Sequence, residues 1–456
     1  MSDKFGALNR AKAVDAHKAG DLKGALAAYT DYLAQHPIDA GIWTNLGALY
    51  RATGRHDMAR LAQMRAAFLK PGDKGILNNY ANILSDLGEY ERSIELRLQS
   101  LAMDPKHVMH HAMIGRCYRG MGRYRDAIDY LTPKVSEFSE EPEIELQLAF
   151  AQLGAGDFGA GFRTYDARWK TENLAPTNVP FSRWTEGTDV NGKTILVLPE
   201  QGFGDMVLMS RFIPLVAKLG AKVRLVAKRP LLRLLDGVEG IEWIGLGAAS
   251  GDPVDYWVSL MDLPKLVYGP NEQGAVPTPT PLSIPADSID RASTLTRHHK
   301  GMFKVGVVWS GSSTYKANSF RSFSHREFLP MTALPNVQLF SLYKGPFLEA
   351  YQADGSAALI VDSASSDRDF ADCAAMMCEM DLIITSDTAT AHIAGSLGLP
   401  TWVMLHWDAF WVYRHTGDTT DWYPSMRLFR QSKPQDWGSA FDAVYDALRE
   451  KVSNHG

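Results

Sequence analysis

The stretch "KTILVLPEQGFGDMVLMSRF", residues 193–212, combines the pattern of a buried strand with that of a helix. Residues 194–198 are apolar or β-branched, as in a strand that is covered on both faces. After a short turn, apolar side chains recur at the spacing of a helix that faces a core. Gly202, Gly204 and Asp205 lie at the turn. The pattern predicts a strand–turn–helix unit with a carboxylate in the first helical turn.

Strand and helix patterns continue to alternate downstream of this unit. Further strands are predicted at 222–228, 241–247, 303–311, 337–345, 357–363, 382–387 and 401–406. Such alternation favours parallel sheets built from βαβ units. A Pro- and Gly-rich segment at 268–286 interrupts it, so we expect two Rossmann-like domains, at 192–290 and 300–456. Ligands of such sheets bind beyond the carboxyl ends of the strands.

Upstream of residue 170 the chain is repetitive. Glycine recurs at positions 20, 54, 88, 122 and 156, each 34 residues after the last. A small residue follows each glycine after five positions: Ala25, Ala59, Ser93, Ala127 and Gly161. The period and the phrase "WTNLGALY" (43–50) resemble the tetratricopeptide repeat, a helix pair that buries its apolar face only by stacking. We expect a repeat array over 1–170, followed by a linker over 171–191.

Tetratricopeptide arrays present a concave groove to peptides and proteins, so the array is expected to recruit a protein partner. An alternative is that it only spaces or assembles the chain. The positions predicted to face the groove are Trp43, Asn45, Asn78, Asn79, Asn82 and His110.

The composition excludes several classes of protein. With 45% hydrophobic and 22% charged residues, the 456-residue chain is typical of a globular protein with more than one domain. A net charge of -5 argues against a nucleic-acid binder. The three cysteines lack the spacing of a zinc site or a disulfide framework. No apolar run approaches the ~20 residues of a membrane span, so a cytoplasmic protein is expected.

Asp205 is the candidate general base. A carboxylate at the mouth of a strand-to-helix turn could remove a proton from an attacking hydroxyl. Glu200, Gln201, Gly202 and Gly204 would line the same cleft. The alternative is that Asp205 only stabilises the positive N-terminus of its helix.

The candidate donor site is the stretch that follows strand 382–387. Ser386, Asp387, Thr388 and His392 lie within about one turn of each other at a helix start, where main-chain amides suit a phosphate. Residues that follow other strands are also expected to bind the donor: Ser310, Lys316, Arg321 and Lys344. The alternative is that Asp387 caps the helix and His392 packs in the core.

Two other features have competing interpretations. Trp411 lies in an aromatic-rich stretch, 406–424, that could form a wall for a base or sugar ring, or part of the core. Asp367-Arg368-Asp369 has the spacing of a metal-binding DxD motif. It precedes a helix pattern, so we interpret Asp369 as a helix cap and assign no metal site.

Four stretches together resemble bacterial tetratricopeptide-repeat glycosyltransferases of GT-B fold. They are "PEQGFGDMVL", "VGVVWSG", "DLIITSDTATAHIAGSLGLPTWVML" and "DWYPSMRLFRQ". The second half is similar to the ADP-heptose:lipopolysaccharide heptosyltransferases. The resemblance implies an N-terminal α-solenoid followed by a GT-B pair of Rossmann-like α/β domains. It assigns the proposed base to Asp205 and the donor phosphates to 387–392, where Ala389 replaces the family's glycine.

The repeat array is foreign to heptosyltransferases and resembles that of protein O-glycosyltransferases, including flagellin-modifying enzymes. The resemblance implies transfer of a sugar to Ser/Thr hydroxyls of a protein, with flagellin as the leading acceptor. The donor would be a nucleotide-sugar co-substrate, with CMP, UDP, GDP and ADP left open, and no cofactor is expected. Two alternatives remain: a transferase of polysaccharide or lipid-linked glycan assembly, and a non-catalytic scaffold.

Overall fold

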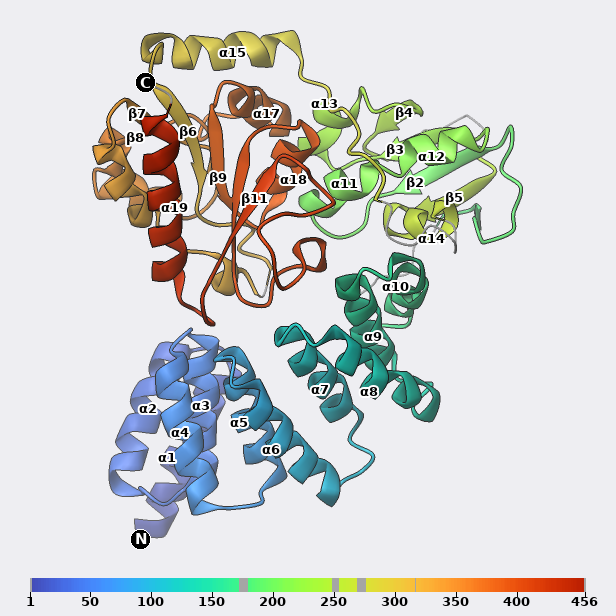
Figure 1. The fold of residues 1–456 in the computed structure, drawn as a ribbon. Coiled ribbons are helices and arrows are strands. Elements are labelled where there is room, and N and C mark those ends of the chain that lie inside the picture. Colours follow the sequence, from blue (N-terminus) through green and yellow to red (C-terminus); the bar gives the residue numbers. More distant parts are fainter. Residues whose placement is uncertain (1, 172–178, 248–253, 269–275, 316, 455–456) are drawn as a thin grey trace. The chain divides into compact units, whose positions relative to one another are not determined.

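The computed structural model describes residues 2–171, 179–247, 254–268, 276–315 and 317–454. The chain divides into two compact units, Met1–Ala151 and Gln152–Gly456, each of which is described by itself (Figure 1). Parts of the predicted linker and of the predicted 268–286 connection lie outside the described residues, as does Lys316.

The first unit consists of consecutive helices that pack against their neighbours in the chain. They are α1 (Ser2–Lys18), α2 (Leu22–Gln35), α3 (Ala40–Ala52), α4 (His56–Leu69), α5 (Lys74–Asp86), α6 (Tyr90–Met103), α7 (Val108–Gly120), α8 (Tyr124–Glu137) and α9 (Pro142–Ala155), the last of which continues into the second unit.

The repeated glycines and small residues have the roles that the sequence predicts. The five glycines end helices with left-handed backbone, at φ values from +70° to +86°, which glycine adopts at low cost. The small residues at 25, 59, 93 and 127 are fully buried. They allow the two helices of each pair to pack closely, and the predicted solenoid is confirmed in this unit.

The first sheet of the second unit is parallel and five-stranded. Its strands are β1 (Ser182–Arg183), β2 (Thr194–Leu198), β3 (Lys222–Val226), β4 (Ile241–Gly245) and β5 (Tyr256–Ser259). The spatial order is β1-β5-β2-β3-β4. The chain therefore runs outward from β2 to β4 and returns to the other side of β2, so the order reverses there.

The second sheet is parallel and six-stranded. Its strands are β6 (Phe303–Val308), β7 (Val337–Ser341), β8 (Ile360–Asp362), β9 (Leu382–Ser386), β10 (Thr401–Leu405) and β11 (Met426–Arg430). The order is β11-β10-β9-β6-β7-β8, so the reversal lies between β6 and β9. Two parallel α/β sheets are thus confirmed, with β1, β5 and β11 as strands that the sequence pattern did not predict.

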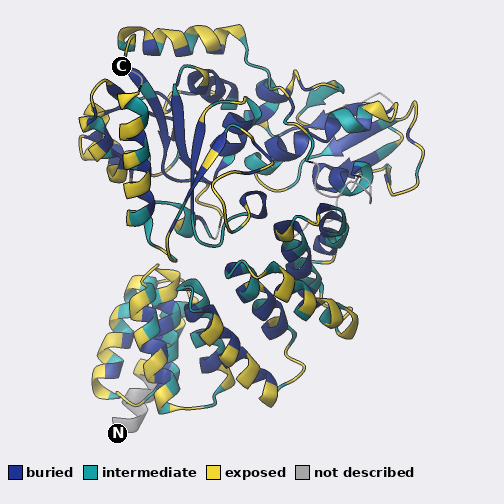
Figure 2. Ribbon diagram, in the orientation of Figure 1, coloured by how far each residue is buried: buried dark blue, intermediate teal, exposed yellow. Residues whose placement is uncertain are grey.

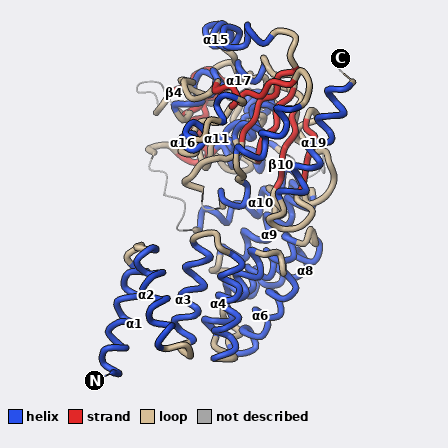
Figure 3. The backbone as a smooth tube through the Cα atoms, turned by 90° about the vertical axis from the view of Figure 1, so that its left-hand side faces the viewer, coloured by secondary structure: helices blue, strands red, loops and turns tan. Residues whose placement is uncertain are grey.

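Helices cover both sheets, whose strands form the buried interior (Figures 2 and 3). The helices that matter for the site are α10 (Phe158–Thr164), η1 (Tyr165–Lys170), α11 (Phe203–Ser210), α17 (Phe370–Cys378) and α18 (Ala389–Ser396). The outer faces of α15 (Ala286–Thr296) and α19 (Trp437–Ser453) are exposed. α10 and η1 belong to the second unit, although the sequence expectation placed them in the array.

Candidate active site

Two helices, each of which follows a strand of a different sheet, lie close together at their N-termini. α11 follows β2, where the first sheet reverses, and α18 follows β9, beside the reversal of the second. A Cβ atom added to Gly204 would lie 2.8 Å from His392 Cδ2 and 3.3 Å from the Ala389 Cα. Glycine leaves the room that this approach requires. The two strand-end motifs, predicted from distant parts of the sequence, therefore lie together.

Asp205 lies in the first turn of α11 and is half-buried. Its Oδ2 accepts a hydrogen bond of 2.9 Å from the Gly202 N–H, so it does cap its own helix. Burial raises the pKa of the Asp205 carboxyl, and the charges of Arg321 and Lys228 act in the opposite direction. One carboxylate thus serves the helix and lies within the electrostatic reach of two cations.

Asp387 is a second carboxylate at the same place. It is buried, and this raises the pKa of Asp387 to about 6. The charge of Arg321 lowers that pKa, whereas the charge of Asp205 raises it further. Two carboxylates from opposite sheets therefore interact electrostatically around one arginine.

Asp387→Asn should stabilise the protein at neutral pH but not in acid. A carboxyl whose pKa is raised from 3.8 to about 6 on folding contributes stability below pH 3.8, which is lost as pH rises through about 6. A shift of about two pKa units corresponds to about 3 kcal/mol. The measurement is the unfolding free energy of both proteins in urea. As the pH rises from about 4 to about 7.5, the variant should become more stable relative to the native chain, by up to that amount.

The matched control is Asp442→Asn, on the exposed side of α19. If both variants change stability with pH in the same way, Asp387 does not carry the effect.

His392 is a neutral, buried ring. Its Nδ1 lies 3.1 Å from the Tyr423 hydroxyl. Burial, together with the charges of Arg211 and Arg321, lowers the pKa of His392 to about 3. The packing alternative therefore holds, and only Nε2 remains as a polar atom for a ligand.

Arg321 is held in the loop after β6 beside the start of α18. Its Nε donates to Asn318 Oδ1 at 3.3 Å, and its guanidinium lies over the Tyr315 ring at 4.5 Å. A Cβ on Gly311 would lie 2.8 Å from Arg321 Nη2 and 3.1 Å from Thr388 Cγ2. Within the described part of the chain Arg321 has no carboxylate partner within 4 Å. The predicted strand-end cation is thus placed beside Thr388.

The start of α18 has free hydrogen-bonding capacity. Thr388 is its N-cap residue but forms no side-chain cap. The Ser386 hydroxyl, at the end of β9, is fully buried and has no hydrogen-bond partner among the described residues. Buried polar groups are rarely left unpaired. These groups are therefore suited to an anionic ligand at the helix start.

Two predicted donor residues are used within the protein instead. The Ser310 hydroxyl bonds Ser322 at 2.9 Å and accepts from Asn318 Nδ2 at 3.0 Å, which fixes the loop that carries Arg321. Lys344 Nζ donates to the main-chain oxygen of Asp367. Ser310 therefore supports the loop that carries Arg321, and Lys344 bonds the segment that precedes α17.

The predicted helix cap at Asp369 is confirmed. Asp369 Oδ1 accepts from the N–H groups of Ala371 and Asp372 and so caps α17. Among the described residues, no group of three or more His, Cys, Asp or Glu side chains could hold a metal ion.

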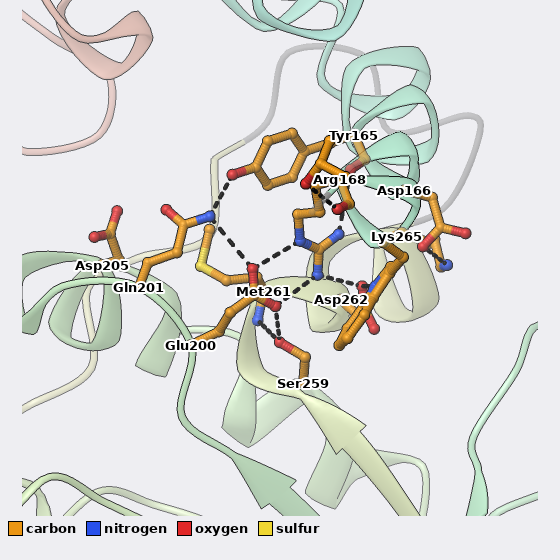
Figure 4. A network of polar contacts seen from close by, with 12 residues as sticks. Tyr165, Asp166, Arg168, Glu200, Gln201, Asp205, Ser259, Met261, Asp262 and Lys265 are labelled. Carbon is orange, nitrogen blue, oxygen red and sulfur yellow. Dashed lines mark hydrogen bonds and ion pairs between the residues drawn. The ribbon is translucent and has the colours of Figure 1, made fainter. Parts of the chain in front are cut away.

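The prediction that Glu200 lines the cleft is wrong. Arg168, from η1, donates to Glu200 Oε1 at 2.8 Å and to Oε2 at 3.0 Å, and Ser259 also bonds Oε2 (Figure 4). The same guanidinium bonds Asp262 Oδ1 at 2.6 Å. Both Glu200 oxygens are therefore committed to a buried ion cluster.

Gln201 and Gly202 form the turn itself. Gln201 has a left-handed backbone, with φ of +61°, and its side-chain amide donates to the Tyr165 hydroxyl. Lys228 Nζ donates to the Gln201 main-chain oxygen. Gly202 contributes its N–H to Asp205.

Trp411 belongs to the core, which corrects its placement in a ligand-stacking wall. It is buried and packs edge-on against Phe162 of α10, at a centroid distance of 5.7 Å, and against Trp422 at 4.9 Å. Trp411 and Trp422 thus pack on α10 as part of the core.

The predicted groove residues of the first unit are largely engaged in its own packing. Trp43 Nε1 donates to the Pro37 oxygen at 2.9 Å, and Asn82 Oδ1 accepts from Arg97 at 2.7 Å. His110 is buried. Asn79 Nδ2 donates to Thr44 at 3.1 Å. His110 is therefore a packing residue, whereas Trp43, Asn79 and Asn82 are half-buried and their place in a groove stays a prediction.

The two remaining groove candidates are half-buried. Asn45 lies beside the Tyr29 hydroxyl. The Asn78 side chain forms no hydrogen bond with another described residue.

The sequence reasoning missed several residues that shape the site. Lys228 follows β3, and the strand-end rule that selected Arg321 could have found it. Arg211 donates to the Trp422 main-chain oxygen at 3.0 Å, and Arg168 and Tyr165 reach the turn from η1. No local signal marks these three, because their partners are distant in sequence.

In the part of the chain that the structure describes, no helix has the length and apolar character to cross a membrane.

Comparisons with known proteins bear on both units. Family models of the tetratricopeptide repeat match residues 10–74 and 75–107. The chain is 25% identical to Protein FlbA of Caulobacter vibrioides, over 96% of this chain and 83% of that protein. It is 27% identical to Superkiller protein 3 of Schizosaccharomyces pombe, over 24% of this chain and 8% of that protein.

Solved structures of two other proteins are similar to parts of this chain. A MamA structure is 18% identical, with a TM-score of 0.33, over 39% of this chain and 100% of that one. The type IV pilus biogenesis factor PilW is 23% identical, with a TM-score of 0.33, over 37% of this chain and 79% of that one. The comparisons therefore identify tetratricopeptide repeats in residues 10–107 and one relative, Protein FlbA, that is similar over nearly the whole chain.

Proposed function

We propose that the protein is a GT-B glycosyltransferase that moves a sugar from a nucleotide-sugar to a hydroxyl of a protein acceptor. One observation carries the proposal: the close approach of α11 and α18 at Gly204, which brings Asp205 of one sheet to Asp387 and Arg321 of the other. In doubly wound sheets, ligands bind at such reversals of strand order. Here the reversals of two sheets lie next to each other, an arrangement that suits a reaction between two bound substrates.

The α18 side of the site is suited to the donor phosphate. The α18 N-terminus, the Arg321 guanidinium and the unpaired Ser386 hydroxyl offer hydrogen-bond donors and positive charge. In the transfer, the bond between the anomeric carbon and the phosphate oxygen breaks. These groups would stabilise the negative charge that develops on that oxygen.

The α11 side supplies the base. The acceptor hydroxyl oxygen forms the new bond to the anomeric carbon, and its proton passes to the Asp205 carboxylate. Burial raises the pKa of Asp205, which makes its carboxylate a stronger base than an exposed one. The Gly202 N–H keeps one oxygen in place while the other is left for the proton.

The acceptor would be bound by the repeat array. Tetratricopeptide repeats in residues 10–107 favour a protein acceptor. Protein FlbA is similar to this chain across the repeats and the α/β region alike. Flagellin remains the leading candidate, on the resemblance to flagellin-modifying enzymes alone.

A thermal-shift screen with UDP, GDP, ADP and CMP tests the donor site. One nucleotide should raise the melting temperature, since a ligand at ~100 times its Kd stabilises by about 2.7 kcal/mol. Arg321→Gln should abolish that shift. Arg326→Gln is the matched control, because Arg326 is exposed and pairs with Asp354.

If no nucleotide shifts the native protein, or if both variants shift equally, the phosphate site is misplaced. The non-catalytic scaffold then becomes the better interpretation.

A further inference from the structure

The turn before Asp205 is held in a conformation that its sequence does not favour. Gln201 has a φ of +61°, a region that is unfavourable for a non-glycine residue and persists only where surrounding contacts impose it. The contacts here come from the Lys228 ammonium, which binds the Gln201 main-chain oxygen, and from the Tyr165 hydroxyl, which binds its side chain.

Tyr165 is itself fixed by burial and by its neighbour. It is 8% exposed, and burial raises its pKa to about 12, so the hydroxyl keeps its proton. The Arg168 guanidinium lies 4.8 Å from the Tyr165 ring centroid and donates to the Tyr165 main-chain oxygen at 3.3 Å. The first turn of η1 is therefore a rigid support for Gln201.

Arg168 anchors the same segment to the residue next to Gln201. Its two bonds to Glu200 and its bond to Asp262 are all at most 3.0 Å long, and the three side chains are at least nine-tenths buried. Figure 4 shows Tyr165 and Arg168 reaching Gln201 and Glu200 side by side. Two consecutive residues of the turn are thus held from η1.

α10, the helix before η1, packs on aromatic residues from segments next to both sheets. Phe162 of α10 lies 6.1 Å from Phe212, which follows α11, and 5.7 Å from Trp411, which follows β10. Phe158 lies 5.3 Å from Trp422 and 6.3 Å from Tyr268. A displacement of the segments next to either sheet would therefore also displace α10, which leads into η1.

We infer that residues 158–170 set the position of Asp205, with Tyr165 as a positioning residue that acts through Gln201. The inference rests on the proposed function, in which Asp205 is the base. Tyr165 keeps the turn in the left-handed conformation from which α11 starts, and so orients the carboxylate.

The test is Tyr165→Phe in the full chain, which removes the hydroxyl and keeps the ring. Amide hydrogen exchange of peptides within 199–205 should quicken, while the melting temperature and the nucleotide shift stay unchanged. The screen identifies a nucleotide, and the corresponding sugar-nucleotide is then the substrate for hydrolysis, with water as the acceptor. In this reaction kcat should fall about tenfold at constant KM. Tyr351→Phe, which removes another buried hydroxyl, bonded to the Ile360 oxygen, is the control and should change none of these.

A second variant shows whether the effect passes through Gln201. Gln201→Gly keeps the backbone conformation but removes the side-chain bond, so its loss of kcat should not add to that of Tyr165→Phe in the double variant. Unchanged exchange in 199–205, full kcat despite faster exchange, or additive losses would each overturn the inference. The exchange measurement needs no substrate. If the wild-type protein binds no nucleotide, that result contradicts the proposed function, whereas the exchange result still tests whether Tyr165 holds the turn.

Discussion

Asp205→Asn should reduce sugar transfer by about 10² to 10⁴-fold and leave nucleotide binding intact. The amide has the shape of the carboxylate and can still accept from the Gly202 N–H, so the start of α11 should survive. It cannot take up the proton of the acceptor hydroxyl. Transfer is measured as release of nucleotide from the sugar-nucleotide in the presence of acceptor, and binding as the thermal shift.

The control for Asp205→Asn is the same change at Asp57, an acid in the first turn of α4. It should leave both transfer and binding unchanged. Transfer by Asp205→Asn within tenfold of the native rate would mean that another group accepts the proton. Asp387, the second carboxylate at the site, would then be the next residue to replace.

Arg168→Met should destabilise the second unit by about 3–5 kcal/mol. The side chain that it removes is the shared partner of Glu200 and Asp262, which are 9% and 1% exposed. Methionine fills much of the same space but leaves two carboxylates buried without that cation. Calorimetry of the full chain should show the transition of this unit at a markedly lower temperature.

Two comparisons make the Arg168 result specific. Arg183→Met also removes a partner of Asp262, yet Arg183 is 30% exposed, so its loss should be far smaller. Adding Glu200→Gln and Asp262→Asn to Arg168→Met should recover much of the stability, because the unpaired charges are gone. A loss below about 1 kcal/mol, or no recovery, would show that the ion cluster does not stabilise the unit.

The fold was largely predictable because it is periodic. The 34-residue recurrence of glycine specifies helix pairs, and alternating apolar runs specify parallel strands. β11 was missed because two of its five residues, Arg427 and Arg430, are charged. Paired on one side to β10, it tolerates charges that a central strand would not.

The candidate site was predictable only where the strand-end rule applied. That rule placed Asp205, Arg321 and Asp387 at one locality, and the structure brings them together. It misplaced Glu200, whose partner Arg168 is 32 residues upstream in the chain. It could not distinguish Trp411 as core from Trp411 as ligand wall, since an aromatic side chain suits both.

The last glycine-marked phrase of the sequence, "GDFGAGFRTY" (156–165), has a consequence for how this architecture can diversify. It retains the repeat spacing, yet its Phe158, Phe162 and Tyr165 pack on the α/β region. Helix pairs upstream of α9 are therefore expected to tolerate addition or removal as modules. This phrase is not, because its aromatic side chains pack on the α/β region. A natural recombination boundary is expected within α9, and chimaeras joined at residue 170 should fail to fold.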